Sequence, residues 1–406
     1  MLASKLFASL RPLARVLDRP AMSRLERAVN IADLRACAAR RAPRMVFDYI
    51  DGAADDEISL NRNRTAYSDL ELHYHVLSGH GHVDLRAGTL FGHEMALPFF
   101  CAPTAGQKMF HREGEAAAAR VCSENSTLFC LSALGTTSVH EISAIHSGPK
   151  VLQLYLWKDR DLMRDVLQRA REAGFTGIAL TGDTAWFGKR ERDPRNGFTM
   201  PPTYSPQQIW QAVNAPAWSL DFISHPPMKF EVAYGDKPAE ALAEYFNSKM
   251  SKDYSWKDAE WLLGEWGGHA ALKGVCRPDD AATAVSLGFN AVWVSNHGGR
   301  QLETSPPTID LLPSVREAVG ATVPIIVDGG IMRGTDVAKA LALGADYVGV
   351  GRAYLYGLAA GGTPGVRKAV DVLRTELERA MGLLGVPNVH ELKRRGAELV
   401  KRRRSV

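Results

Sequence analysis

From residue 96 onward, short apolar runs alternate with longer amphipathic stretches. The short runs are rich in apolar and β-branched residues and end at small or polar residues, as buried parallel strands do. The predicted strands are Leu97–Ala102, Thr127–Ser132, Val151–Leu156, Gly177–Thr181, Ala270–Val275, Ala291–Ser295, Pro324–Asp328 and Tyr347–Gly351. The stretches between them have helical periodicity, and several end near a glycine. The predicted helices are Gly114–Asn125, Ser138–His146, Asp159–Ala173, Pro278–Leu287, Thr308–Val319, Thr335–Leu343 and Gly365–Leu384.

Eight such strand–helix units predict an α/β protein with a TIM (β/α)8 barrel. A doubly wound sheet is the alternative, but its usual GxGxxG after the first strand is absent. Two segments interrupt the rhythm. Residues 26–95 predict an N-terminal helical extension with a short hairpin, within a barrel domain that spans 26–390.

A long insertion, residues 191–255, follows the fourth strand. It is rich in proline and in aromatic residues, and loops of this length usually have a function or are disordered. The aromatic residues are Trp210, Trp218, Phe222, Phe230 and Tyr234. Four roles remain open: a lid, an oligomer contact, a membrane-touching segment, or simple packing onto the barrel.

Charge is unevenly distributed in this chain of 406 residues with a net charge of +4. Residues 1–25 and 391–406 are basic, and the remainder is mildly acidic. Residues 1–17 contain no acidic residue and have an apolar helical face, so they resemble a mitochondrial transit peptide or a membrane-surface helix, with a solvated terminus as the alternative. For the last six residues, KRRRSV, we expect a solvated tail, with contact to anionic lipid or nucleic acid as the alternative.

Several classes of protein are disfavoured by composition. The acidic body and the lack of a nucleic-acid motif exclude nucleic acid as the main partner. No apolar stretch is long enough for a transmembrane helix. The five cysteines form no CxxC pair, so we expect neither a disulfide framework nor a metal site, and a reducing compartment is favoured.

Polar residues follow nearly every predicted strand. The carboxyl ends of barrel strands form the active site of this fold, so these residues predict an enzyme. The polar residues at these ends include Ser132, Gln153, Tyr155, Thr181, Asp183, Lys273, Ser295, His297, Arg300, Asp328 and Arg352.

Three groups of these residues indicate particular chemistry. The glycine-rich turns after strands seven and eight, with Arg333 and Arg352 nearby, are typical of a phosphate site. Lys273 follows a buried run and needs a partner, which the electron-rich edge of a flavin would supply; a Schiff-base lysine is the competing interpretation. His297 and Arg300 combine a general base with a carboxylate-binding group.

The stretch SNHGGRQLE at 295–303 closely resembles the signature of the FMN-dependent (S)-2-hydroxy acid oxidase/dehydrogenase family. That family includes glycolate oxidase, lactate oxidase, mandelate dehydrogenase and bacterial quinone-linked L-lactate dehydrogenase. Similar motifs occur in order, and the resemblance spans about residues 27–390. These motifs are FDYIDGAADDE (47–57), APTAGQKM (102–109), QLYLWKDR (153–160), LTGDT (180–184), LKGV (272–275), DGGIMRGTDV (328–337) and LGADYVGVGR (343–352).

The resemblance implies a mechanism. His297 would accept the substrate's proton and Asp183 would orient it. Arg300 and Arg190 would clamp the carboxylate, and Lys273 would stabilise the reduced flavin. The remaining implied contacts are Tyr49 and Tyr155 to the substrate, and Pro103, Thr104, Ala105, Ser132, Gln153, Thr181, Lys273, Ser295, Asp328, Gly329, Gly330, Arg333, Gly351 and Arg352 to FMN.

One departure concerns the phosphate: Met332 stands where the family usually has arginine, so FMN is held less tightly or Arg333 substitutes. Leu134 and Ala105 would line a pocket suited to a small aliphatic acid, with L-lactate as the best candidate. The family also implies a homotetramer.

The electron acceptor is predicted to be a quinone, reached by peripheral contact with a membrane through the insertion and the basic termini. The alternative is an oxidase that uses O2 and forms H2O2. The expected location is cytoplasmic and peripheral on the inner membrane, or mitochondrial if residues 1–25 are a transit peptide.

Overall fold

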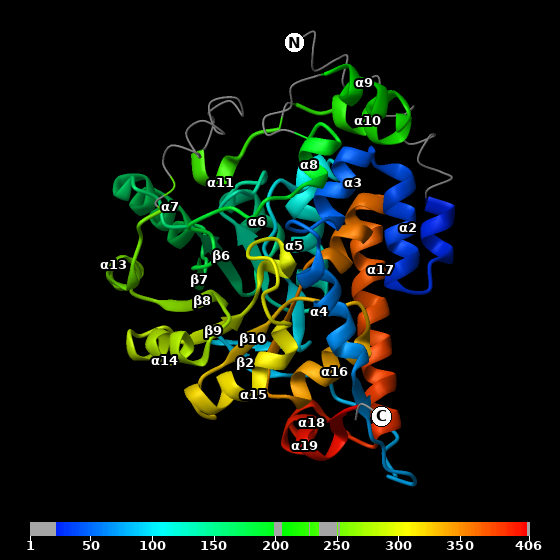
Figure 1. The fold of residues 1–406 in the computed structure, drawn as a ribbon, viewed down its shortest axis with the longest axis vertical. Helices are drawn as coiled ribbons and strands as arrows, with labels where there is room; N and C mark the ends of the chain where they lie inside the picture. Colours follow the sequence, from blue (N-terminus) through cyan, green and yellow to red (C-terminus); the bar gives the residue numbers. More distant parts are fainter. Residues whose placement is uncertain (1–21, 199–204, 227, 235–249, 251, 404–406) are drawn as a thin grey trace.

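Eight parallel strands close into a barrel in the computed structural model, which describes residues 22–198, 205–226, 228–234, 250 and 252–403 (Figure 1). The strands are β4 (Phe99–Cys101), β5 (Phe129–Ser132), β6 (Lys150–Leu154), β7 (Gly177–Thr181), β8 (His269–Val275), β9 (Ala291–Val294), β10 (Ile325–Val327) and β11 (Tyr347–Val350). Their order around the barrel is β10-β11-β4-β5-β6-β7-β8-β9. The predicted TIM barrel is confirmed, and each predicted strand lies within two residues of an observed one.

Side chains alternate between the barrel interior and the helices outside it. In β4, Phe99 and Cys101 pack outward, whereas Phe100 packs inward, edge-on to Trp293 with 5.4 Å between ring centroids. Residues of the predicted hairpin, β2 (Gly88–Leu90) and β3 (His93–Met95), join this inner cluster. The hairpin therefore fills one end of the barrel, and polar groups gather at the other end.

Eight helices follow the strands and surround the barrel (Figure 1). They are α5 (Gly114–Glu124), α6 (Val139–Ile145), α7 (Arg160–Glu172), α13 (Trp256–Trp266), α14 (Pro278–Ser286), α15 (Thr308–Val319), α16 (Gly334–Ala342) and α17 (Arg352–Leu384). Two differ from the prediction. Helix α13 was not predicted, although Ser255 caps its start and Gly267 ends it with φ +63°. The predicted helix Gly365–Leu384 is the C-terminal part of α17, after a kink at Gly361 and Gly362; the part before the kink was not predicted because residues 353–360 are buried all round, which hides the helical pattern.

The N-terminal extension contains α2 (Ile31–Arg41), α3 (Arg44–Asp51) and α4 (Ile58–Ser68), as predicted. Helix α2 lies beside α17 (Figure 1). Gly299 approaches α4 so closely that a Cβ atom there would lie 2.6 Å from the Leu60 backbone nitrogen. The extension thus packs against the loop that carries the predicted catalytic histidine.

The C-terminal segment is folded as far as residue 403. It forms α18 (Val389–Arg394), α19 (Gly396–Leu399) and β12 (Val400–Arg402), and β12 pairs antiparallel with β1 (Leu70–Leu72). Buried Leu392, Leu399 and Val400 anchor this segment, whereas Lys401, Arg402 and Arg403 of the predicted solvated tail are exposed.

The described parts of the insertion form short helices: α8 (Arg192–Arg195), α9 (Pro206–Val213), α10 (Pro216–Ile223) and α11 (Glu231–Tyr234). Trp218 is buried, and its Nε1 donates to the Met109 carbonyl at 2.8 Å. The amphipathic segment predicted within residues 1–17 lies outside the described residues. Among the helices that can be described, none is both long and apolar enough to cross a membrane.

Candidate active site

A cavity of about 470 Å³ opens at the carboxyl ends of the barrel strands. Its size lies within the usual range for small-molecule sites. Most of the predicted site residues line it. These are Tyr49, Pro103, Thr104, Ala105, Ser132, Leu134, Gln153, Tyr155, Thr181, Arg190, Lys273, His297, Arg300, Asp328, Gly329, Gly330, Gly351 and Arg352. Asp183 and Ser295 bond to lining residues, and Arg333 alone among the predicted residues points elsewhere.

A row of hydrogen bonds crosses three adjacent strand ends. Ser132 Oγ donates to Gln153 Oε1 at 3.0 Å, and Gln153 Nε2 donates to Thr181 Oγ1 at 2.8 Å. All three side chains are buried. The row presents hydrogen-bonding atoms along one wall, as a planar heterocycle with polar edges requires.

Lys273 is buried beside this wall. Its Nζ donates to Ser295 Oγ at 2.8 Å and to Asp328 Oδ2 at 2.7 Å, and Ser295 Oγ donates to Asp328 Oδ1 at 2.6 Å. The ammonium is also 5.0 Å from the centre of the Trp293 ring. The lysine is thus a paired, oriented cation at the cavity wall.

His297 lies in the short helix η2 (His297–Gly299) with φ +56°. Its Nδ1 is 3.2 Å from Asp183 Oδ1 and 3.3 Å from Oδ2, so Nε2 is the ring nitrogen left for a substrate. Burial opposes ionisation of Asp183, but His297 and Lys273 outweigh it and lower the pKa of Asp183. The pair has the arrangement of a general base and its orienting carboxylate.

Two arginines that line the cavity lie close to Tyr49. The guanidinium carbons of Arg300 and Arg190 are 4.8 and 5.3 Å from the centre of the Tyr49 ring. Arg300 Nη1 donates to the carbonyls of Tyr49 (2.6 Å) and Gly52 (3.1 Å). Burial, and next the charge of Arg190, lower the pKa of Arg300 to about 10. Burial also raises the pKa of Tyr155, which keeps its hydroxyl a donor.

The glycine turns after β10 and β11 form the opposite end of the cavity. Gly330 has φ +84°, and a Cβ atom there would lie 2.1 Å from the Asn63 carbonyl oxygen. Arg352 donates to three carbonyls, those of Ile50 (3.0 Å), Gly298 (2.9 Å) and Gly52 (2.7 Å).

Met332 faces the cavity at this end, but Arg333 does not. Arg333 is half exposed and its Nη1 lies 2.6 Å from Glu376 Oε1. The structure therefore does not bring Arg333 to the predicted phosphate site. Side chains of adjacent residues leave a loop in different directions, so Arg333 does not take the place of an arginine at 332.

Sequence reasoning missed several lining residues. Four are aromatic: Phe110, Phe187, Phe198 and Phe230. Phe198 stacks on Tyr49 with 4.7 Å between ring centroids. A further missed residue is the acidic Asp193, three positions after Arg190 and thus one helical turn away. That spacing was a usable signal, whereas the contacts of Phe198 and Phe230 depend on how the insertion folds back over the barrel.

The cavity fits FMN. The hydrogen-bonded row and Lys273 suit the flavin ring, and Asp328 suits the ribityl hydroxyls. The turns at Gly329–Gly330 and Gly351 expose backbone at the end where a phosphate would lie, and α17 begins there. At Gly329 and Gly330 a Cβ atom would lie 2.9 Å from Thr308 Oγ1 and 2.1 Å from the Asn63 carbonyl oxygen, so these turns require glycine.

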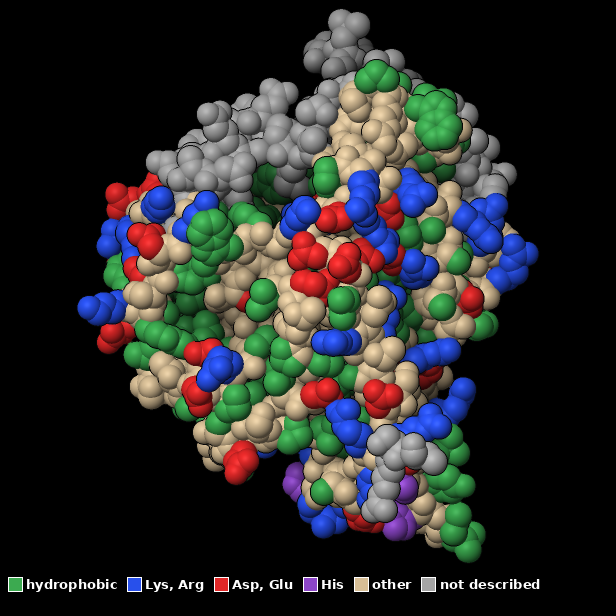
Figure 2. All heavy atoms as spheres, viewed as in Figure 1, with side chains coloured by type: hydrophobic (Ala, Val, Ile, Leu, Met, Phe, Trp, Pro, Cys, Tyr) green, Lys and Arg blue, Asp and Glu red, His purple; other side chains and the backbone are tan. Residues whose placement is uncertain are grey.

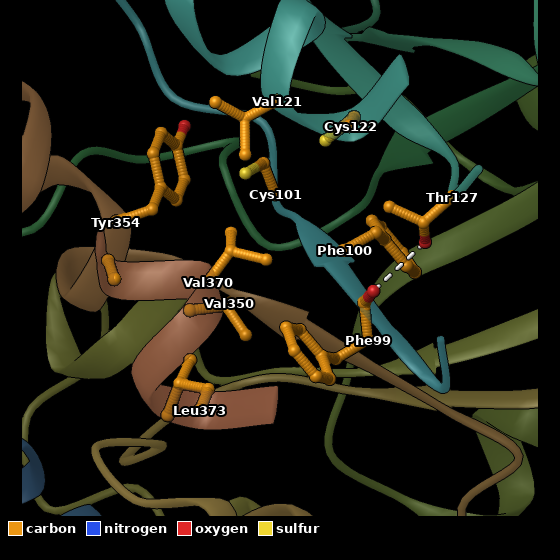
Figure 3. A pocket seen from close by; sticks show the side chains of 11 residues that line it. Phe99, Phe100, Cys101, Val121, Cys122, Thr127, Val350, Tyr354, Val370 and Leu373 are labelled. Carbon is orange, nitrogen blue, oxygen red and sulfur yellow. Dashed lines mark hydrogen bonds between the residues drawn. The ribbon is translucent and has the colours of Figure 1, made fainter. Parts of the chain in front are cut away.

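A second, much smaller void lies between β4, α5 and α17 (Figure 3). Its volume of about 10 Å³ holds one water at most. Thr127 Oγ1 donates to the Phe99 carbonyl at 2.9 Å beside it, and buried Cys101 and Cys122 face it. This void has no room for a substrate.

Comparison with known proteins agrees with this description. The sequence model of the family described as FMN-dependent dehydrogenase matches residues 38–399. A putative L-lactate dehydrogenase from Mycobacterium tuberculosis is 39% identical over 93% of this chain and 91% of its own length. Glycolate oxidase from Spinacia oleracea is 37% identical over 90% of this chain and 94% of its own length. The monotopic membrane protein (S)-mandelate dehydrogenase superposes with a TM-score of 0.87 at 30% identity, covering 92% of this chain and 99% of its own. The predicted FMN cofactor and oxidoreductase activity are confirmed.

Proposed function

The chain belongs to the FMN-dependent dehydrogenase family, and from this premise we propose that it oxidises a small L-2-hydroxy acid, L-lactate being the best candidate. One observation carries the proposal: a His–Asp pair and two arginines face the same cavity beside the predicted flavin wall. An anionic substrate and a removable proton are what this combination serves. Relatives named L-lactate dehydrogenase and glycolate oxidase support the substrate class.

The arginines bind and orient the substrate. Arg190 and Arg300 clamp its carboxylate, and the hydroxyls of Tyr49 and Tyr155 donate to its oxygens. Arg300 is held by two backbone carbonyls, so its orientation precedes substrate binding. The clamp fixes which hydrogen of the substrate faces His297.

Oxidation to the 2-oxo acid removes two hydrogens: His297 accepts one of them as a proton at Nε2, and Asp183 stabilises the imidazolium that forms. When bound, FMN would supply the acceptor for the other hydrogen and the electron pair. Lys273 places a positive charge against the ring that becomes negative, and Asp328 orients the lysine.

The proposed small size of the substrate rests on Leu134 and Ala105, which both line the cavity. One methylene of fit is worth only about 1–3 kcal/mol, so neighbouring chain lengths are oxidised more slowly rather than excluded.

We infer that the electrons pass to a quinone. Dehydrogenases and oxidases both occur among the relatives, so an oxidase that forms H2O2 is the second candidate. Two-stage stopped-flow absorbance separates them: L-lactate bleaches the flavin anaerobically, and the reduced enzyme is then mixed with oxygen or a quinone analogue. Rapid recovery with the quinone and slow recovery with oxygen is expected. Fast recolouring by oxygen would make it an oxidase, and no bleaching by any 2-hydroxy acid would overturn the proposed reaction.

Peripheral membrane contact through the insertion fits this acceptor. Figure 2 shows hydrophobic side chains gathered over α9 and α10. The exposed apolar residues there are Ile209, Trp210, Val213 and Ile223. Arg44 of α3, which contacts α9, and Arg195, whose carbonyl accepts from Gln207 of α9, are more than 70% exposed. The structural relative named as a monotopic membrane protein supports the same contact.

Flotation with anionic phospholipid vesicles tests this contact. The wild-type protein is expected to float with the vesicles. The double variant Trp210→Ser, Val213→Ser is expected to remain in the bottom fraction of the gradient. Equal flotation of both would reject α9 as the contact. The cytoplasmic face of the inner membrane, or the mitochondrion if residues 1–25 are a transit peptide, is the proposed location, and a homotetramer is the proposed assembly.

A further inference from the structure

Asp193 is an acidic residue inside a cavity that otherwise serves to bind an anion. Its side chain is only 13% exposed, and its Oδ2 lies 3.3 Å from Arg190 Nε. Neither the carboxylate clamp nor the removal of the proton requires it. Its position beside the clamp therefore needs a separate explanation.

The charges around Asp193 supply one. Arg190 and Arg300 attract it, Asp48 repels it, and burial, the largest influence, raises its pKa. The clamp thus has two guanidinium groups and one carboxylate. A single substrate carboxylate neutralises the remaining positive charge, whereas a second carboxylate finds no partner in the clamp.

The other cations of the cavity are already engaged. Lys273 pairs with Asp328, and Arg352 donates to three backbone carbonyls. Asp183, next to His297, adds a further negative group. Among the residues that the structure describes and that line the cavity, no basic side chain is left for a second carboxylate. A charge buried without a partner is strongly disfavoured.

We propose that Asp193 is a specificity-determining residue that restricts the site to monoanionic 2-hydroxy acids and excludes 2-hydroxy dicarboxylates. The proposal rests on the proposed function, since it assumes that Arg190 and Arg300 bind the substrate's carboxylate. Asp193 acts through the charge balance of the clamp, and it touches neither the proton nor the electrons transferred.

The test compares L-lactate with L-malate, a dicarboxylate, as reductants of the bound flavin in anaerobic stopped-flow experiments. The measured quantity is the ratio of the second-order reduction constants, malate over lactate. In Asp193→Asn, which keeps the side chain's size and an oxygen for Arg190, this ratio is expected to rise at least about tenfold over wild type. An unchanged ratio would overturn the proposal.

Glu191→Gln is the matched control. It removes the same charge two residues away, but Glu191 pairs with Lys189 and Arg195 outside the cavity, so its ratio is expected to equal that of wild type. A rise as large as in Asp193→Asn would also overturn the proposal, because net charge alone would then explain it.

A second measurement keeps the proposal testable if Asp193→Asn folds poorly. Inhibition of lactate oxidation by L-malate is measured in wild type and in Asp193→Ser, and malate is expected to inhibit the variant more strongly. If lactate bleaches wild type but both readouts are unchanged, only the role of Asp193 fails. If no 2-hydroxy acid bleaches wild type, the proposed function fails and this proposal with it.

Discussion

The two ends of the cavity, which we propose bind the substrate carboxylate and the FMN phosphate, are built by different means. At the substrate end, the charged side chains of Arg190, His297 and Arg300 converge; carboxylates hold the first two, and backbone carbonyls hold Arg300. At the phosphate end, glycine turns present backbone, and the one lining guanidinium, Arg352, is bonded to carbonyls. The first end depends on charge and orientation, and the second on the close approach of backbone. Different changes should therefore break each end.

The largest effect is expected at the substrate end, from His297→Asn. Asparagine tolerates the positive φ of this position but supplies no base. Flavin reduction should slow by about 10²–10⁴-fold in anaerobic stopped-flow measurements. FMN content should stay normal, because the phosphate end is untouched; loss of FMN together with activity would contradict the separation of the two ends.

Gly330→Ala should break the phosphate end. Its Cβ would lie 2.1 Å from the Asn63 oxygen, so the turn must shift. The Kd for FMN, from quenching of flavin fluorescence, should rise more than about tenfold. Gly320→Ala is the control, since it has a similar φ of +76° with nothing within 4 Å of the new Cβ. Equal FMN affinity in the two variants would refute the clash.

Arg192→Met should loosen the substrate end without touching substrate. Arg192 joins the loop after Arg190 to α3, since its Nη1 lies 3.0 Å from Asp51 and 3.3 Å from Asp48, and its Nη2 pairs with Glu57. The KM for L-lactate should rise about tenfold, with a smaller change in kcat. Arg44→Met, which removes an exposed partner of Asp48, should change neither. An equal rise in KM in Arg44→Met would show that loss of any positive charge near Asp48 weakens substrate binding, and would contradict a specific role for Arg192.

Met332→Arg should strengthen the phosphate end. A guanidinium facing the cavity there should lower the Kd for FMN severalfold, by about 1 kcal/mol. Riboflavin, which has no phosphate, should bind as in wild type. Arg333→Met should leave both affinities unchanged because Arg333 pairs with Glu376; weaker FMN binding in that variant would show that Arg333 reaches the phosphate.

The smallest effect concerns Asp51, which connects the two ends by bonding Arg192 and the Tyr356 hydroxyl of α17. Burial opposes its ionisation, but Arg35, Tyr356 and Arg192 lower its pKa below the unfolded value. The contribution of ionised Asp51 to the free energy of unfolding is therefore present above about pH 4 and is lost as the pH falls further. Asp51→Asn should reduce the loss of stability between pH 7 and pH 3 by about 1 kcal/mol, measured by urea unfolding. An equal loss in both proteins would contradict this role.

The sequence alone determined the barrel and most of the site. Apolar runs mark buried strands whatever surrounds them, and the ends of parallel strands converge, so Ser132, Gln153, Thr181, Lys273 and Asp328 could be placed together from their positions after such runs. The catalytic roles around His297 were implied by the resemblance of its motif to a known family, not by the strand pattern.

Only the tertiary structure decided the direction of side chains on loops and the contacts between distant segments. It turned Arg333 away and Met332 inward, placed Asp193 beside the clamp, and paired β12 with β1. The physical reason is that periodicity reports which face of a helix or strand is buried, whereas a loop has no period. The direction of a loop side chain depends on partners such as Glu376 that lie far along the chain.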